Sequence, residues 1–141
     1  MNPDLIFFPV LIQVLLTLFV FIRLGQVKEQ AVKRGEVDQT RRALHDDAWP
    51  DYVLKVNNNI RNQFETPVLF YVLVIGLWSL GAATVTAQLL ALAYALLRLA
   101  HASVHLGSNI VKVRKRIFQA SIVALLLLSG LLLLALGGIP V

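Results

Sequence analysis

Two segments of this chain combine apolar residues with polar side chains that recur at helical spacing. The first stripe carries amide, guanidinium and carboxylate groups at positions i, i+3, i+4 and i+7: Asn58, Arg61, Asn62 and Glu65. The second stripe repeats every three or four residues: Tyr94, Arg98, His101, His105 and Asn109. In a helix each set lines one face. The two stripes together suit a small anionic ligand with several hydrogen-bonding groups.

The expected depth of two charges supports a shared polar interior. If the helices meet the membrane surface near residues 57 and 107, Glu65 and Arg98 lie about 12 Å and about 13 Å inside, at about 1.5 Å per residue. An isolated charge at the membrane centre costs about 2.5 kcal/mol or more. We therefore expect Glu65 and Arg98 to face the protein interior and each other, within one protomer or across a subunit boundary. A polar lock on helix packing is the simpler alternative to a binding role.

His101 and His105 are four residues apart and could share a metal ion. No H-E-x-x-H pattern surrounds them and the chain has no cysteine, so we expect hydrogen-bonding histidines and no metal. The basic run KVRKR at residues 112–116 is typical of the solvated flank of a membrane helix. Its guanidinium groups could alternatively reach the charge of a ligand at the cavity mouth.

Four apolar segments must position these groups. Of the 141 residues, 57% are hydrophobic and 15% charged, and the mean hydropathy is +0.72, whereas a soluble domain carries about a quarter charged residues. We predict a single all-α domain over residues 1–141, an integral membrane bundle with helices near residues 5–24, 57–80, 85–109 and 116–137, where the second helix could alternatively start near Val53. A membrane span takes roughly 20 residues, and the second apolar run is long enough only if the polar residues before it belong to the same helix. Pro67 is a candidate kink within it.

The basic residues indicate membrane orientation rather than nucleic-acid binding. The net charge is +5, and of 13 Lys and Arg only Arg61 and Arg98 lie away from two connections, which leaves 13 − 2 = 11 at or beside them. Basic loops face the cytoplasm in most membrane proteins. We therefore expect residues 25–56, with partial order and a short surface helix, and residues 110–116 to be cytoplasmic, and both termini to be periplasmic. The pattern suggests a bacterial inner membrane, with membrane lipids and no nucleic acid as partners.

Two stretches resemble a known family. RNQFETPVLFY at residues 61–71, in which Asn62 precedes Glu65 by three residues, resembles the signature of the MAPEG family, the membrane-associated proteins in eicosanoid and glutathione metabolism. LLRLAHASVHLGSNIVKVRKR at residues 96–116 resembles the third-helix segment of that family, with Arg98 and His101 matching in type and spacing. The resemblance implies a homotrimer with active sites between subunits. It also implies glutathione as cosubstrate, bound from the cytosolic side, for chemistry on lipophilic small molecules.

The resemblance assigns roles to individual residues. Asn62 and Glu65 would bind the polar groups of glutathione, with Glu65 at its amine, and Arg98 would support the site. Arg114, or alternatively Arg116, would stabilise the thiolate, because a nearby cation favours the anionic form of a thiol.

Two positions depart from the family pattern. Asn58 stands where glutathione-binding members commonly have Arg, so a carboxylate partner is lost unless Arg61 or Lys55 replaces it. His105 stands where some members have Tyr. The predicted catalytic candidates are Arg114 and Arg116, and the predicted ligand-binding set is Asn58, Arg61, Asn62, Glu65, Arg98, His101 and His105.

Three functions follow from these patterns. The first is a membrane-embedded transferase or peroxidase that uses glutathione or another thiol on lipophilic electrophiles. The second is a non-catalytic lipid-binding or partner-presenting protein of the same fold, which the substitution at Asn58 favours. The third, a pathway for small polar solutes, is the least favoured, because the far halves of the last three expected helices carry no charge.

Overall fold

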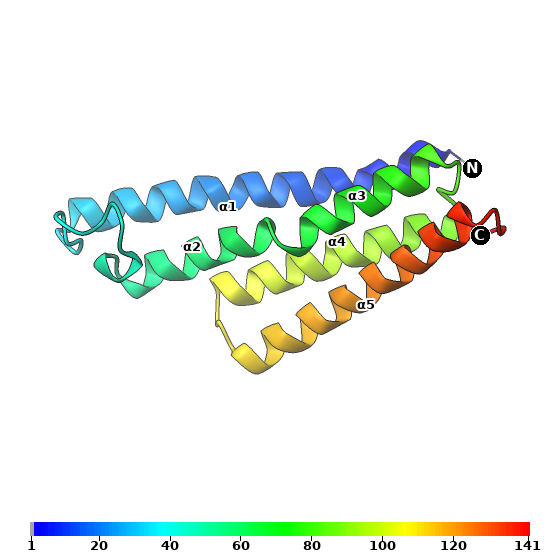
Figure 1. The fold of residues 1–141 in the computed structure, drawn as a ribbon. Coiled ribbons are helices and arrows are strands. Elements are labelled where there is room, and N and C mark those ends of the chain that lie inside the picture. Colours follow the sequence, from blue (N-terminus) through cyan, green and yellow to red (C-terminus); the bar gives the residue numbers. More distant parts are fainter. Residues whose placement is uncertain (1) are drawn as a thin grey trace.

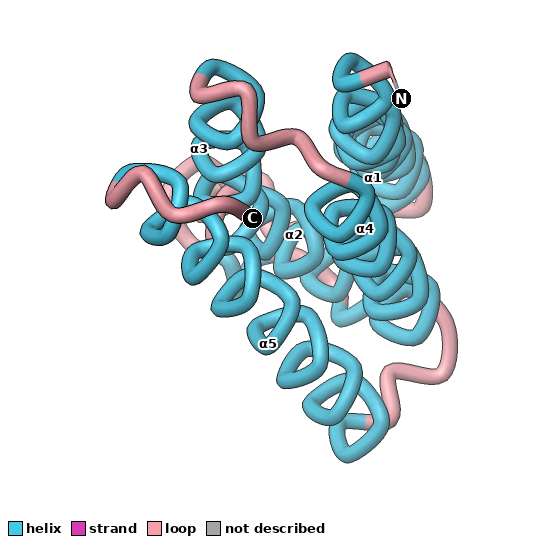
Figure 2. Tube along the Cα trace, turned by 90° about the vertical axis from the view of Figure 1, so that its right-hand side faces the viewer, coloured by secondary structure: helices cyan, strands magenta, loops and turns pink. Residues whose placement is uncertain are grey.

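The computed structural model describes residues 2–141, which form a helical bundle with both chain ends at the same end (Figure 1). The α-helices are α1 (Phe7–Lys33), α2 (Asp51–Gln63), α3 (Thr66–Ser79), α4 (Val85–Leu106) and α5 (Val111–Leu136), with short 3-10 turns at Pro3–Ile6 and Asp46–Ala48. We call the end with both termini the termini end, and the end with residues 34–50 and the α4–α5 turn the loop end. Figure 2 looks along the bundle from the termini end.

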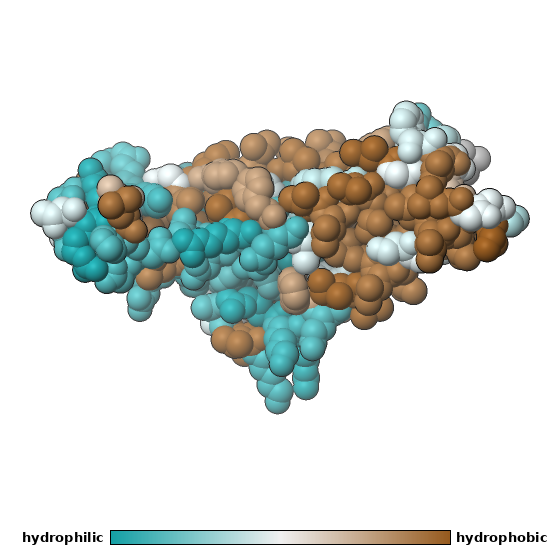
Figure 3. Space-filling model, viewed as in Figure 1, coloured by the Kyte–Doolittle hydropathy of each residue, from teal (hydrophilic) through white to brown (hydrophobic). Residues whose placement is uncertain are grey.

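Three of these helices are long and apolar enough to cross a membrane, namely α1 with its preceding turn, α4 and α5. α2 and α3 follow one another as a fourth, interrupted rod (Figure 1). The protein is therefore an integral membrane protein, and the predicted all-α membrane four-helix bundle is confirmed. Apolar side chains cover most of the visible surface toward the termini end, whereas the loop end is hydrophilic (Figure 3).

α1 extends well beyond the expected residues 5–24. Its 27 residues span about 40 Å, longer than the roughly 30 Å hydrocarbon core of a bilayer. A buried seam with spacings of three or four residues runs along its whole length: Pro9, Gln13, Leu16, Val20, Leu24, Val27 and Ala31. Because this seam continues past the first basic residue, Arg23, packing rather than hydropathy sets where the helix ends.

The helix expected over residues 57–80 is divided in two. α2 begins earlier, at Asp51, and ends at Gln63, and α3 begins at Thr66. Glu65 between them has φ −91° and ψ −99°, outside the helical region. Pro67 lies in the first turn of α3, where its missing N–H costs nothing, so this proline starts a helix rather than kinking one.

The turn between α4 and α5 is shorter than expected. α4 ends at Leu106 and α5 begins at Val111, so the basic run at residues 112–116 lies within the first turns of α5. Asn109 adopts a positive φ of 51°, a conformation that Asn tolerates better than most residues. This tight turn fixes the start of α5 close to the end of α4.

The long connection between α1 and α2 is folded against the loop end. Its 3-10 turn at Asp46–Ala48 is the only regular element among residues 34–50, where we expected a short surface helix. Tyr52 donates a hydrogen bond to Glu36 at 2.6 Å, and Arg41 pairs with Asp47 at 2.7 Å. The loop is thus held by polar contacts and by Val37 and Trp49, which pack on the apolar cluster between α1 and α2. It lies beside the opening of the site described next.

Candidate functional site

Arg98 of α4 occupies the break between α2 and α3. Its side chain is fully buried, and its Nη2 donates a hydrogen bond to the carbonyl of Asn62 at 2.8 Å. Asn62 lies in the last turn of α2, where carbonyls lack helical partners and a cation is favourable. The Nε and Nη1 groups of Arg98 have no partner within the described part of the chain. Arg98 therefore supports the broken helix and keeps unused donors there.

A chain of buried amides joins three helices at the same level. Gln13 donates to Gln63 at 2.7 Å, and Gln63 donates to Asn59 at 2.8 Å. Asn59 donates to the carbonyl of Ala102 at 3.4 Å. Such interhelical hydrogen bonds contribute to helix association in membranes. These hydrogen-bonded amides were not predicted from the sequence, although Gln13 is conspicuous as the one amide within the first apolar run.

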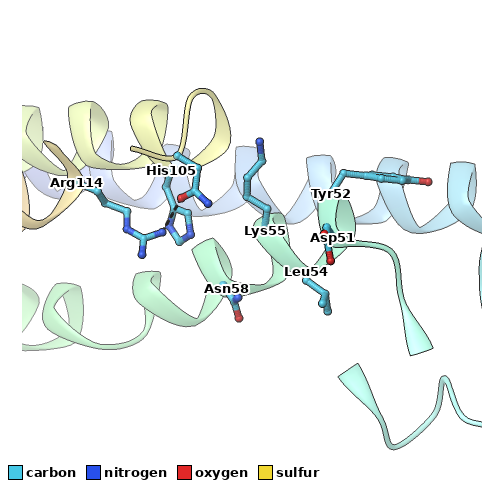
Figure 4. Close-up of a pocket in the computed structure, with 8 residues that line it drawn as sticks. Asp51, Tyr52, Leu54, Lys55, Asn58, His105 and Arg114 are labelled. Carbon is cyan, nitrogen blue, oxygen red and sulfur yellow. Dashed lines mark hydrogen bonds between the residues drawn. The ribbon is translucent and has the colours of Figure 1, made fainter. Parts of the chain in front are cut away.

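A polar pocket of about 560 Å³ opens at the loop end between α2, α4 and α5. We call it the polar pocket, and its lining is Asp51, Tyr52, Leu54, Lys55, Asn58, His105, Asn109 and Arg114. In Figure 4, Arg114 and His105 lie beside each other across from Asn58, and Asp51 and Tyr52 lie further along α2. Two contacts fix its cations: Arg114 donates to Asn109 at 2.7 Å, and Lys55 donates to the carbonyl of Gly107 at 3.0 Å.

A second pocket of about 270 Å³ adjoins the first through Arg114. We call it the mixed pocket, because its lining includes polar, basic and apolar side chains: Asn62, His101, Val111, Arg114, Lys115 and Phe118. Arg114 is the one residue that lines both pockets. A ligand in the polar pocket and a ligand in the mixed pocket would therefore meet at the same guanidinium group.

The two histidines separate the pockets on the α4 side. His101 lines the mixed pocket and His105 the polar pocket, and each residue is 3% exposed. Their ring centroids lie 5.8 Å apart in an edge-to-face arrangement. The Nδ1 atom of each ring is buried without a partner within residues 2–141. The described residues contain no group of three or more His, Cys, Asp or Glu side chains placed to hold a metal ion.

The structure places four predicted site residues outside the linings of the two pockets: Arg61, Glu65, Arg98 and Arg116. Glu65 is exposed at the break and makes no ion pair with Arg98 among residues 2–141, because the non-helical backbone at Glu65 takes it off the face of α2. Arg61 is engaged instead with Asp46 of the loop, at 2.5 Å. Arg116 is exposed and lines neither pocket.

The remaining predicted residues are brought to one region at the loop end. Asn58, Asn62, His101, His105 and Arg114 all line the two pockets. Four further pocket residues were not predicted from the sequence: Asp51, Tyr52, Lys115 and Phe118. Their signal lies in helical register: Asp51 precedes Lys55 by one turn, and Phe118 follows Arg114 by one turn.

Comparison with known proteins gives one match. A family model described as "MAPEG family" matches residues 6–134, which is nearly the whole chain. No curated protein and no solved structure matches the chain.

Proposed function

The chain belongs to the MAPEG family, and from this premise we propose that it is a membrane-embedded transferase or peroxidase that uses glutathione on lipophilic electrophiles. The observation that carries the proposal is that Arg114 lines both the polar pocket and the mixed pocket. The polar pocket has room and charge for an anionic, water-soluble thiol. The mixed pocket, with Phe118, suits the reacting end of an apolar molecule.

Arg114 would act on the sulfur. A thiol becomes nucleophilic when it loses its proton, and a cation beside it favours the thiolate. The hydrogen bond from Arg114 to Asn109 at 2.7 Å holds the guanidinium at the junction of the pockets. Thiolate formed there would face the mixed pocket.

Two reactions are open to such a thiolate. In a transfer, the sulfur gives an electron pair to an electrophilic carbon, the carbon–sulfur bond forms, and the displaced group takes a proton. With a hydroperoxide, the sulfur attacks one oxygen, the O–O bond breaks, and the alkoxide takes a proton. A second glutathione then converts the resulting sulfenic acid to a disulfide and water.

The second substrate would come from the bilayer. Beyond Phe118, α5 continues along the membrane with apolar side chains that form a third cavity with α3, of about 290 Å³. Its lining is almost entirely aliphatic: Leu69, Val72, Leu73, Ile122, Leu125, Leu126 and Ser129. This apolar groove lies on the same helix as Arg114, so a lipophilic molecule could reach the thiolate without leaving the membrane.

The proposal includes assembly and orientation. Glu65 and Asn62 lie on or near the surface of the single chain at the break, and a neighbouring copy packed there in a homotrimer would enclose them. Glu65 could then contact the cosubstrate. The basic loop end would face the cytoplasm of a bacterial inner membrane and both termini the periplasm, in line with the positive-inside rule.

Calorimetry of glutathione binding to the detergent-purified protein tests the proposal. Glutathione should bind saturably, and both Arg114→Ala and Glu65→Gln should weaken it. Lys112→Gln is the matched control, because Lys112 is an exposed cation on α5 that lines neither pocket. Absence of binding to the unaltered protein at millimolar glutathione would refute the proposed cosubstrate.

A second function is supported by the apolar groove itself. A non-catalytic lipid-binding or partner-presenting protein would need the groove between α3 and α5 but not the thiolate site. Mass spectrometry of lipids that copurify with the protein separates the two functions. A retained lipid that is lost in Leu125→Trp, together with no thiol binding, would favour this alternative.

A further inference from the structure

We propose that one face of α1 binds the headgroup of an anionic phospholipid, at the level where the helix leaves the membrane toward the loop end. Arg23 binds the phosphate, and Gln26 and Gln30 lie beside it. One acyl chain lies along the apolar side chains that precede Arg23 on the helix. We call this surface the headgroup site. It is separate from the proposed thiol chemistry, because none of these residues lines the polar pocket or the mixed pocket.

The headgroup site is an open cavity of about 440 Å³ on the surface of α1. It begins at Arg23, the first charged residue after Asp4 and the end of the first apolar run. Arg23, Gln26 and Gln30 recur with spacings of three and four residues, so they lie on one helix face. Every residue of the lining is polar or charged: Arg23, Gln26, Glu29, Gln30, Lys33 and Arg34. A polar surface therefore starts where the apolar surface of the helix ends, which is the level of the headgroups in a bilayer.

The charge of the headgroup site suits an anion. Three basic residues outnumber the one acidic residue in its lining, and that residue, Glu29, pairs with Lys33 at 2.6 Å. Arg23 forms no ion pair in the described part of the chain. Its Nη1 donates one hydrogen bond, to Oε1 of Gln26 at 3.3 Å. Because a guanidinium group has five N–H donors and matches the geometry of phosphate, Arg23 keeps donors for a headgroup.

The apolar part of the proposed site is a row of exposed side chains that leads to Arg23. Leu11, Leu15 and Phe19 follow one another every four residues and are 52%, 55% and 56% exposed. Side chains four residues apart form a ridge along a helix. From Leu11 to Arg23 the helix rises about 18 Å, slightly more than half of the roughly 30 Å hydrocarbon core. The row therefore matches the length of an acyl chain in one leaflet.

This face of α1 points away from the side where a neighbouring copy is proposed. Phe21 contacts Phe64 at the α2–α3 break, with ring centroids 5.9 Å apart. Phe21 and Arg23 are two residues apart, which is about 200° around the helix. A copy packed at the break therefore leaves Arg23 and Phe19 facing the bilayer, where lipid is the partner at hand.

Native mass spectrometry of the full-length protein in detergent tests the site. The probes are palmitoyl-oleoyl phosphatidylglycerol, which is anionic, and phosphatidylcholine with the same chains, which is not. The first phosphatidylglycerol should bind about fivefold or more tightly than the first phosphatidylcholine, the effect of one basic residue at a membrane surface. Arg23→Gln should abolish this preference, and Arg23→Lys should keep part of it, because the charge remains but the planar donor set is lost. Phe19→Ala should weaken both lipids alike.

Lys112→Gln separates a defined site from a general attraction of lipid to the basic loop end. It removes the same charge from an exposed residue of α5 outside the headgroup site and should keep the preference. Equal losses in Arg23→Gln and Lys112→Gln, no preference in the unaltered protein, or displacement of the lipid by inorganic phosphate alone would overturn the proposal. Glutathione binding should be unchanged in Arg23→Gln, because Arg23 lines neither pocket of the thiol site. Failure of the proposed thiol function would therefore leave this test intact.

Discussion

The termini half and the loop half of the bundle are built on different principles. At the termini end a single apolar cluster joins the first 3-10 turn, α3, α4 and α5, with Phe70, Val74, Leu77 and Leu128 fully buried. At and beyond the α2–α3 break a second apolar cluster packs α1 against α2, but the interior also holds Gln13, Arg98 and two histidines. Among the described residues, every buried side-chain nitrogen or oxygen without a partner belongs to one of these four.

This difference indicates which half determines stability and which determines binding. Apolar burial needs no ligand to be complete, whereas an unpartnered buried polar group costs free energy until a ligand, water or neighbouring subunit satisfies it. We therefore expect changes at the termini end to lower stability without affecting recognition. Changes to the polar pocket residues of the loop end, outside its own apolar cluster, should mainly affect recognition.

The largest effect should come from truncating Phe70. Its ring is fully buried and stacks on Tyr94 with centroids 4.4 Å apart. Phe70→Ala should lower the free energy of unfolding by about 3–5 kcal/mol, because it opens a cavity in a packed core. Thermal unfolding in detergent measures this loss, and Val123→Ala on the exposed face of α5 is the control. An effect no larger than that of the control would show that the termini half is not the stabilising core.

Truncating Arg114 of the loop half should have the opposite effect to Phe70→Ala: it should weaken ligand binding and leave stability almost unchanged. Arg114→Ala should weaken glutathione binding by about 1.5–3 kcal/mol, the range for a hydrogen bond to a charged group, which is about 10- to 150-fold in affinity. Its unfolding temperature should stay close to that of the unaltered protein, because Arg114 is only half-buried at a pocket rim. A large loss of stability with little loss of affinity would reverse the comparison.

The amide chain at the boundary between the halves should show an intermediate effect. Gln13→Leu removes the donor to Gln63 and should cost about 1 kcal/mol of unfolding free energy. A double-mutant cycle with Gln63→Leu should give a coupling of about 0.6 kcal/mol, the average for such pairs in membranes. Strict additivity of the two changes would mean that this hydrogen bond does not stabilise the bundle.

The two halves also differ in how well the sequence predicts them. Apolar runs with helical periodicity predict α4, α5 and the membrane part of α1, because burial in lipid or protein dominates their energetics. The extension of α1 to Lys33 was not predicted, and α2 starts at Asp51, before either expected start. Both depend on the two helices packing against each other outside the membrane, which hydropathy does not report.

The sequence predicted those site residues whose position depends only on helical register. Asn58, Asn62, His101 and His105 share helix faces, and all line the pockets. The pairing of Arg61 with Asp46 depends on a loop residue 15 positions away, and a long flexible side chain can reach many partners. Register could not place Glu65 either, because the stripe assumes a continuous helix through a position where the backbone is not helical.

The smallest expected effect concerns the loop at residues 34–50, which is joined to the bundle through only Val37 and Trp49 of the second apolar cluster and is otherwise held by polar contacts. A hydrogen bond from the Thr40 hydroxyl lowers the pKa of Asp38 below its ordinary value of 3.8, and one from Arg41 lowers that of Asp47 in the same way. Because the folded pKa values are depressed, the stabilisation from both carboxylates is present above the unfolded value of about 3.9 and is lost as the pH falls through the folded values. Acidification from about pH 5 to about pH 3 should therefore loosen this loop. Amide hydrogen exchange, corrected for the pH dependence of the intrinsic exchange rate, measures the change.

Amides of α3 should keep their protection over the same range, because no ionisable carboxylate lies within that helix. Equal loosening of α3 would show that acid acts on the whole bundle. The two halves would then not differ in their response to acid, even at the loop, where the difference should be easiest to detect.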